Sequence, residues 1–234
     1  MDKIKRIKSI SIWIFLIPFI SINTCLILIT EFQWIFPNQE DIIHNTFPYL
    51  DGGASISRTV RPYPSWLIFK PAMFLTSFFL IKYWHYNKDV IIKLNKHHKH
   101  INKIVFFGVA SAIALTIHSI FLGIKFDNDL YKLFRRVIML SFIIFEITAQ
   151  AYLVLALYTI KDKIKEYINE KFLKIKLLLV SSLIIIAIIC VPIISWPGDQ
   201  FKFLKHLLEW DYFLGVITFY LLTFFMWKNE DKNN

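Results

Sequence analysis

The sequence predicts an all-α fold: a polytopic membrane protein built as a bundle of six transmembrane helices with a long first outer loop. Three observations lead to this fold class. Hydrophobic residues make up 56% of the 234 residues, with 23 Phe and 7 Trp among them, which is more apolar surface than a soluble domain of this length can bury. These residues are gathered into six long runs, and Lys and Arg are concentrated in the short segments between the runs.

Each of the six runs is long enough to cross the hydrocarbon core as a helix, which takes roughly 20 mostly apolar residues. Helices are required because an open strand edge in lipid leaves backbone groups unpaired. The predicted spans are residues 10–31, 65–84, 104–124, 137–160, 175–195 and 208–227. Pro18, Pro71 and Pro192 lie in spans one, two and five and are expected to kink them, although Pro71 is near a helix start, where proline is tolerated. No segment is polar enough for a separate soluble domain, so residues 1–234 form a single transmembrane domain.

The first span begins like a signal peptide, with four basic residues in its first eight positions: Lys3, Lys5, Arg6 and Lys8. The apolar run that follows extends to about Ile29 and is not ended by a small-residue cleavage site. We therefore expect an uncleaved first span.

Orientation follows from the basic residues that flank the spans. If the N-terminus is inside, the inner segments 1–9, 82–103, 161–176 and 228–234 hold eighteen of the 27 Lys and Arg residues. By the positive-inside rule both termini are then cytoplasmic, and the long first loop, residues 32–64, is outside. The membrane would be the plasma membrane in a bacterium and a secretory-pathway or Golgi membrane in a eukaryote.

Several other classes of protein are disfavoured. The net charge of +10 does not indicate a nucleic-acid partner, because the lysines stand in short loops beside apolar runs, where they orient the chain. Cys25 and Cys190 both lie inside apolar runs and form neither a disulfide framework nor a metal site. The segment 97–100, His-His-Lys-His, lacks a partner Cys or carboxylate cluster. We expect no metal and no cofactor.

Ionisable side chains within spans are costly, so they are informative. Glu146 lies ten residues beyond Arg136, roughly 15 Å below the outer interface, and Gln150 follows on the same helix face. His118 is roughly 10 Å deep. Lys70 and Glu209 lie near the outer ends of spans two and six.

These depths predict a polar cavity open to the outer side, because the inner halves of the spans contain little besides Ser and Thr. The alternative is that each group makes a structural hydrogen bond between helices, with Lys70 extending outward to water.

The first outer loop contains the segment FPYLDGGASISRTVRPYPSW, residues 47–66, which is crowded with Gly, Pro and Ser. Asp51-Gly52-Gly53 predicts a turn, because paired glycines allow positive φ. Arg58 and Arg61 offer planar forks to phosphate or carboxylate; alternatively they pair with acidic residues of the loop or touch lipid headgroups. We expect this segment to form a lid or headgroup clamp.

Two places in the chain carry a family resemblance. FPYLDGGASISR, followed by a second span ending in KYWHYNK, and Glu209-Trp210 at the start of the last span resemble the six-span family that includes the DRAM autophagy modulators, the Frag and Sfk proteins and the Golgi factor for lipid remodelling of GPI anchors. The resemblance implies six spans, inner termini and action on or near membrane lipids, and it supplies no settled catalytic mechanism. Asp51 stands where family members more often have Ser, so a hydroxyl role there does not carry over.

The sequence leaves three functions open. In the first, an outward-facing pocket binds membrane lipids, with phosphate on the arginines; whether a chemical step follows is open, because no G-x-S-x-G motif is present. The second is a small transporter or channel with a Glu/His proton or ion path, and the third is a scaffold for membrane-protein partners. The candidate catalytic residues are His118, Glu146 and Glu209, with His118 or a carboxylate as a general base. The candidate ligand-binding residues are Asp51, Arg58, Arg61, Lys70 and Gln150.

Overall fold

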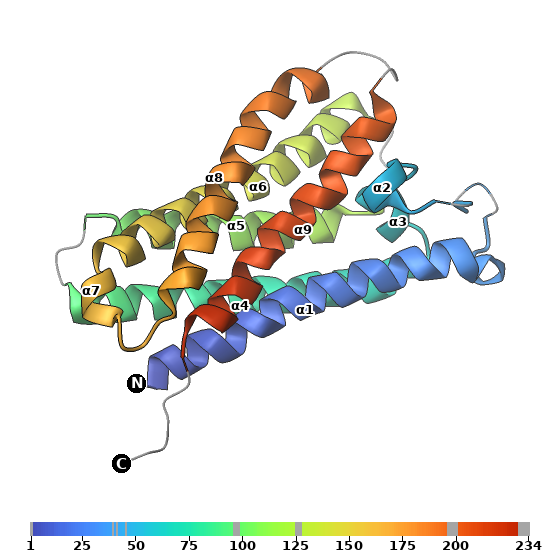
Figure 1. The fold of residues 1–234 in the computed structure, drawn as a ribbon. Helices are drawn as coiled ribbons and strands as arrows, with labels where there is room; N and C mark the ends of the chain where they lie inside the picture. The colour runs from blue at the N-terminus through green and yellow to red at the C-terminus, as the bar shows by residue number, and fades with distance from the viewer. Residues whose placement is uncertain are drawn as a thin grey trace.

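The computed structural model describes residues 2–38, 40, 42–44, 46–95, 99–124, 128–195 and 201–228. These residues are all-α: they contain no strand beyond a single bridge between Ile168 and Trp227. Six long helices dominate the fold (Figure 1): α1 (Asp2–Glu31), α4 (Ser65–Leu94), α5 (Ile101–Phe121), α6 (Asp129–Thr159), α8 (Glu170–Ser195) and α9 (Lys202–Met226). By length and composition, each of the six can cross a membrane.

The predicted spans coincide with these six helices, but three helices extend well past the apolar runs. Helix α1 begins eight residues before 10, at Asp2. Helix α4 continues ten residues beyond 84 to Leu94, and α6 begins eight residues before 137, at Asp129. Backbone hydrogen bonding does not depend on hydropathy, so polar residues prolong a helix outside the apolar run. Pro18 and Pro71 lie inside α1 and α4, and both helices run on past them without a break.

Consecutive long helices pack against one another, and the last closes on the first. Contacts join α1 to α4, α4 to α5, α5 to α6, α6 to α8, α8 to α9, and α9 to α1. In Figure 1 the start of α1, the end of α9 and the short helix α7 (Lys161–Ile164) lie at one end of the bundle, whereas α2 (Pro48–Asp51) and α3 (Ile56–Val60) lie at the other. We refer to these as the terminal end and the loop end.

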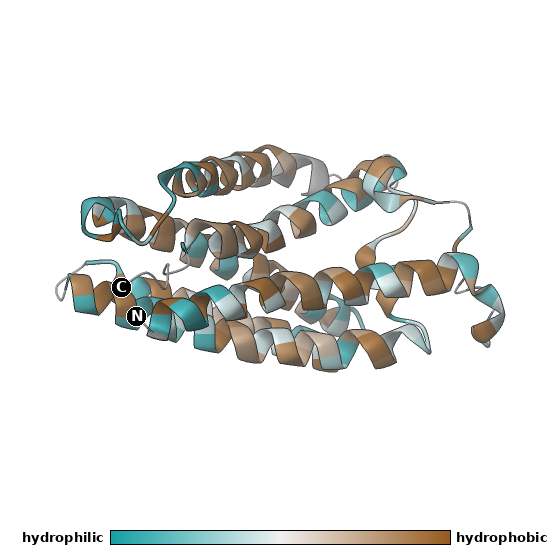
Figure 2. Cartoon of the chain, turned by 60° about the horizontal axis from the view of Figure 1, so that its bottom comes forward, coloured by the Kyte–Doolittle hydropathy of each residue, from teal (hydrophilic) through white to brown (hydrophobic). Residues whose placement is uncertain are grey.

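Large apolar side chains cover the outside of the bundle. Phe106, Leu178 and Ile188 are each about two-thirds exposed, at 65%, 68% and 68%. Figure 2 shows hydrophobic residues along most of the long helices and hydrophilic residues gathered where the termini lie. Such an apolar exterior fits a helical bundle whose solvent is lipid.

Aromatic side chains fill the interior of the closed bundle of six helices. Trp84, Tyr83 and Tyr220 are almost completely buried and contact each other edge to face. Gly108 on α5 makes room for Trp84, because a Cβ atom at this glycine would lie 2.3 Å from the Trp84 Cγ. Close helix approach at a small residue is typical of membrane bundles.

The segment between α1 and α4 is folded rather than a loose linker. It contains η1 (Gln33–Ile35) in addition to α2 and α3. Phe36, Ile42, Ile43 and Ala54 form a small apolar cluster with Ile29 at the end of α1. The first loop is thereby held against the loop end of the bundle.

Candidate functional site

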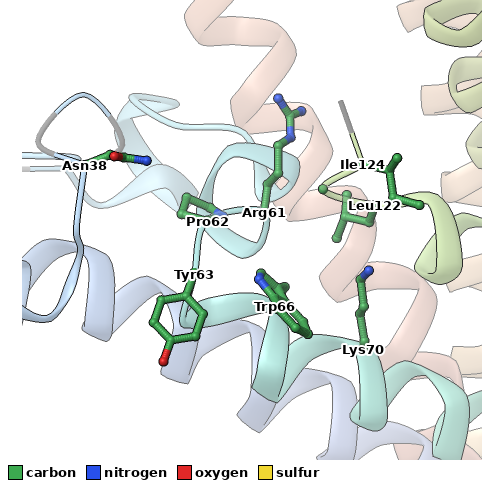
Figure 3. Close-up of a pocket in the computed structure, with 9 residues that line it drawn as sticks. Asn38, Arg61, Pro62, Tyr63, Trp66, Lys70, Leu122 and Ile124 are labelled. Atoms are coloured by element: carbon green, nitrogen blue, oxygen red, sulfur yellow. The ribbon is translucent and has the colours of Figure 1, made fainter. Parts of the chain in front are cut away.

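A cavity of about 340 Å³ opens at the loop end, between the first loop and the adjoining ends of α4 and α5 (Figure 3). We call it the basic pocket, because two of its lining residues are cationic. It is lined by Asn38, Arg61, Pro62, Tyr63, Trp66, Lys70, Leu122, Gly123 and Ile124. Local sequence explains its shape: α3 ends at Val60, Pro62 and Pro64 separate it from α4, and α5 ends just before the positive-φ Gly123.

The two cations of the basic pocket are partly held by protein contacts. The Lys70 ammonium donates a hydrogen bond to the Ile120 carbonyl oxygen at 3.2 Å and lies 5.3 Å from the centre of the Trp66 ring. The Arg61 guanidinium donates to the Ser57 hydroxyl at 2.8 Å. An ammonium has three N–H groups and a guanidinium five, so each of these side chains can donate more than one hydrogen bond. Both residues were predicted from the sequence as ligand-binding.

His118 lies near the basic pocket without lining it. The charges of Arg135 and Arg61 both act on its imidazole ring. His118 Nδ1 and Arg135 Nε are buried and have no hydrogen-bond partner among the described residues. The loop end of α5 and α6 therefore adds two further basic groups beside Arg61, and Arg135 is one that sequence reasoning did not single out.

Asp51 forms the predicted turn, and its carboxylate is used within that turn. It accepts hydrogen bonds from the backbone N–H of Phe47 at 2.7 Å, from that of Gly53 at 2.8 Å and from the Thr46 hydroxyl at 2.7 Å. Desolvation by burial acts to raise the pKa of Asp51, but these hydrogen bonds outweigh it and hold the pKa below its ordinary value. Gly52 has φ of 62°, as a glycine turn requires.

The first loop is docked onto the start of α9. The carbonyl oxygen of Gly52 lies 2.9 Å from His206 Nδ1, and the Trp210 indole donates to the Ala54 carbonyl oxygen at 2.8 Å. The Glu209 carboxylate accepts hydrogen bonds from the backbone amides of Ile56 and Ser57 at the start of α3. The Glu209-Trp210 pair singled out in the sequence thus holds the loop in place.

Arg58, by contrast, points to solvent. Its side chain is exposed, and its backbone N–H donates to the Ser55 hydroxyl, which caps α3. It makes no ion pair with Asp51, and it is not among the described residues that line the basic pocket.

Glu146 and Gln150 lie in the middle of the bundle, away from the basic pocket. Glu146 is 1% exposed. Its Oε2 accepts from the Ser111 hydroxyl at 2.6 Å, and its Oε1 accepts from the Tyr220 hydroxyl and from Gln150 Nε2, the latter at 3.0 Å. Gln150 also donates to the Val216 carbonyl oxygen on α9. These bonds join α5, α6 and α9 around one buried carboxyl group.

Towards the terminal end, a second buried polar group surrounds Lys176, whose side chain is 0% exposed. Its Nζ donates to the Thr223 hydroxyl at 2.7 Å and lies 3.8 Å from the centre of the Phe219 ring. The Tyr83 hydroxyl lies 3.2 Å from the same Thr223 oxygen. This finding corrects one expectation: the inner half of the bundle is not limited to Ser and Thr. Lys176, which the sequence counts both in the inner basic segment 161–176 and in the predicted span 175–195, lies inside α8.

The structure therefore separates seven of the eight predicted site residues into three places and leaves Arg58 exposed. Arg61 and Lys70 line the basic pocket, with His118 near it. Asp51 and Glu209 hold the first loop, and Glu146 with Gln150 lies in the middle of the bundle. The His-rich segment 97–100 falls partly outside the described residues, and the described residues contain no group of three His, Cys, Asp or Glu that could hold a metal.

Comparisons with protein-family models, with curated proteins and with solved structures gave no match to this chain. The family resemblance carried by the first loop and by Glu209-Trp210 accordingly stays a prediction.

Proposed function

We propose that this chain is a multi-pass integral membrane protein that binds the anionic headgroup of a membrane lipid in the basic pocket. The observation that supports this function best is a cavity of about 340 Å³ at the end of an apolar bundle with two cationic side chains in its wall. A lipid phosphate placed there would accept charge-assisted hydrogen bonds from Arg61 and Lys70. Its acyl chains would lie along the apolar exterior of α4 and α5.

The proposed orientation puts both termini in the cytoplasm and the basic pocket in the outer leaflet. The distribution of Lys and Arg in the sequence supports it. The compartment is the plasma membrane in a bacterium or a secretory-pathway membrane in a eukaryote. The resemblance to lipid-remodelling proteins is consistent with a lipid ligand, and no catalytic step is proposed because no nucleophile motif accompanies the pocket.

The test is lipid binding by native mass spectrometry of the purified protein in detergent, titrated with an anionic phospholipid and, separately, with a zwitterionic one. Arg61→Ala and Lys70→Ala are each expected to weaken anionic-lipid binding about tenfold, since a charge-assisted hydrogen bond contributes roughly 1.5 kcal/mol. Arg136→Ala is the matched control, because Arg136 is an exposed arginine at the same end of the bundle.

Equal binding of anionic lipid by the wild type and both pocket variants would refute the proposal. If inorganic phosphate displaces the lipid completely at low concentration, the pocket binds free phosphate and the lipid is incidental.

Transport through the bundle is a second candidate function, and the buried polar groups around Lys176 are the observation that favours it. A proton or ion path needs polar groups in the inner half of the bundle, and Lys176, Tyr83 and Thr223 supply them. Proton flux into vesicles containing the protein, abolished by Glu146→Gln and retained in Glu170→Gln, would favour transport over lipid binding.

A further inference from the structure

The hydrogen bonds around Glu146 are compatible with a carboxylate and with a carboxylic acid. The Ser111 hydroxyl has one proton, yet its oxygen lies 2.6 Å from Glu146 Oε2 and 2.9 Å from the Gly108 carbonyl oxygen. With Glu146 ionised, Ser111 donates to Oε2. With a proton on Oε2, Glu146 donates to Ser111, and Ser111 donates to Gly108 instead. The contact between Ser111 and Glu146 is a hydrogen bond in both states without displacement of any heavy atom, and the contact between Ser111 and the Gly108 carbonyl becomes one only when Glu146 is protonated.

The surroundings of Lys176 are likewise compatible with an ammonium and with an amine. The Thr223 oxygen accepts from Lys176 at 2.7 Å while its own proton is donated to the Phe219 carbonyl oxygen at 2.9 Å. An ammonium donates one N–H to Thr223 and rests over the Phe219 ring as a cation–π contact. A neutral amine can make the same bond to Thr223. Within the described chain, Lys176 has no carboxylate within ion-pair distance.

Glu146 and Lys176 are the only acidic and basic residues that are buried among those whose side chains are described. A single unpaired charge in an apolar interior is costly. The interior therefore favours the two states with no net charge: carboxylate with ammonium, or carboxylic acid with amine. These states differ in the position of one proton.

Two tyrosines, in ring contact with each other, lie between the two buried groups. Tyr83 lies 3.2 Å from the Thr223 oxygen, and the Tyr83 and Tyr220 rings are in contact with their centres 5.0 Å apart. The Tyr220 hydroxyl donates to Glu146 Oε1. Tyr83 on α4 and Tyr220 on α9 are thus the titratable side chains that lie between the pair.

We propose that Glu146 and Lys176 form a charge-compensated proton-binding site inside the bundle, which holds one exchangeable proton on either Lys176 Nζ or Glu146 Oε2. In the exchange the N–H bond of the ammonium breaks and an O–H bond forms on the carboxyl group, so both residues become neutral together. The site is distinct from the basic pocket, and it does not depend on lipid binding.

Infrared difference spectroscopy of the purified protein in detergent tests this site, using the C=O stretch of a protonated carboxylic acid. In the wild type we expect such a band at partial intensity that does not change around neutral pH, because the exchange between Lys176 and Glu146 leaves the number of bound protons unchanged. In Glu146→Gln we expect its loss. Lys176→Gln keeps a donor for Thr223 but removes the charge, so Glu146 should stay protonated. The band should then be at full intensity and independent of pH.

The control is Lys174→Gln, which changes an exposed lysine two residues earlier in α8 and should leave the wild-type band unchanged. The proposal is overturned if Lys176→Gln has the same band intensity as the wild type, or if no band depends on Glu146. Thermal unfolding provides an independent readout: the loss in melting temperature for Glu146→Gln with Lys176→Gln should be smaller than the sum of the two single losses. Additive losses would also overturn it.

Discussion

Asp51 shows how one side chain fixes the conformation of the first loop. Three donors within residues 46–53 converge on its carboxylate, and two of them are backbone amides. A carboxylate that accepts backbone N–H bonds is stabilised in its ionised form, in agreement with the lowered pKa of Asp51. The charge thus stabilises the turn that places Gly52 against α9.

This arrangement predicts a specific pH dependence for Asp51→Asn. Because the pKa of Asp51 is lower in the folded state, its contribution to stability is present above the unfolded pKa, about 3.9, and is lost as pH falls through the folded pKa. At neutral pH the variant should unfold roughly 2 °C below the wild type. The difference should shrink as the pH is lowered towards 3, measured by thermal unfolding in detergent.

The control for this measurement is Asp129→Asn, an exposed carboxylate that pairs with the neighbouring Lys132. A melting-temperature difference for Asp51→Asn that stays constant from neutral to acid pH would contradict the assigned role of the carboxylate.

At the residue scale, the sequence predicts the backbone conformation of a residue better than it predicts which residues that residue contacts. The turn at Gly52 is predictable because positive φ is a local preference of glycine. What the turn packs against is not: a Cβ at Gly52 would lie 1.9 Å from the Phe203 carbonyl oxygen, a contact across more than 150 residues. The same limit explains why Asp51 was expected to face a ligand and instead serves its own turn.

At the scale of elements, docking of α3 onto α9 depends on one acid. Glu209 accepts the first two free amides of α3, Ile56 and Ser57, which have no partner within so short a helix. Trp210 and His206 fix the neighbouring Ala54 and Gly52 through their carbonyl oxygens. The first turns of α9 therefore form the surface on which the first loop is held.

We predict that Glu209→Gln loosens α3 without unfolding the bundle. The Gln side chain retains one oxygen acceptor but directs an NH₂ group towards a backbone donor, which costs roughly 1.4 kcal/mol. Hydrogen exchange at Ile56 and Ser57 should become about tenfold faster, measured by mass spectrometry after peptic digestion.

Asp211→Asn is the matched control, because Asp211 is an exposed acid two residues further along α9. Unchanged exchange in residues 56–60 of Glu209→Gln would show that the carboxylate does not hold the loop.

Six helices of this length could be predicted from the sequence because a run of apolar residues is counted directly. Which face of each helix turns inward could not. Lys176 stands where the basic segment 161–176 overlaps the predicted span 175–195, so composition does not say whether its side chain meets water or the interior, and packing of α8 against α9 buries it on Thr223. Likewise, one outward-facing pocket was expected to include both Glu146 and the loop arginines, whereas the partners of Glu146 lie on α5, α6 and α9 in the middle of the bundle.

At the scale of the whole molecule, the packing of the last long helix against the first determines which connections lie at the same end of the bundle. Six antiparallel helices joined in sequence return the chain to the end where it began, and α9 packs against α1. The bridge between Ile168 and Trp227 ties the α7–α8 connection to the end of α9 on this side. The start of α1, the α7–α8 connection and the end of α9 therefore share one face of the molecule, the terminal end. The first loop and the basic pocket lie at the opposite end (Figure 1).

Single cysteines test this arrangement in a background with Cys25 and Cys190 replaced by Ala. We expect a membrane-impermeant maleimide to label Arg58→Cys in intact cells, because Arg58 is exposed at the loop end. Lys171→Cys and Lys228→Cys, both exposed at the terminal end, should react only after permeabilisation, since basic segments remain cytoplasmic. If instead Lys171→Cys and Lys228→Cys were labelled in intact cells and Arg58→Cys only after permeabilisation, the fold would stand and the proposed orientation in the membrane would be reversed. Labelling of Arg58→Cys and Lys171→Cys from the same side would contradict the fold itself, because an odd number of crossings separates these two positions.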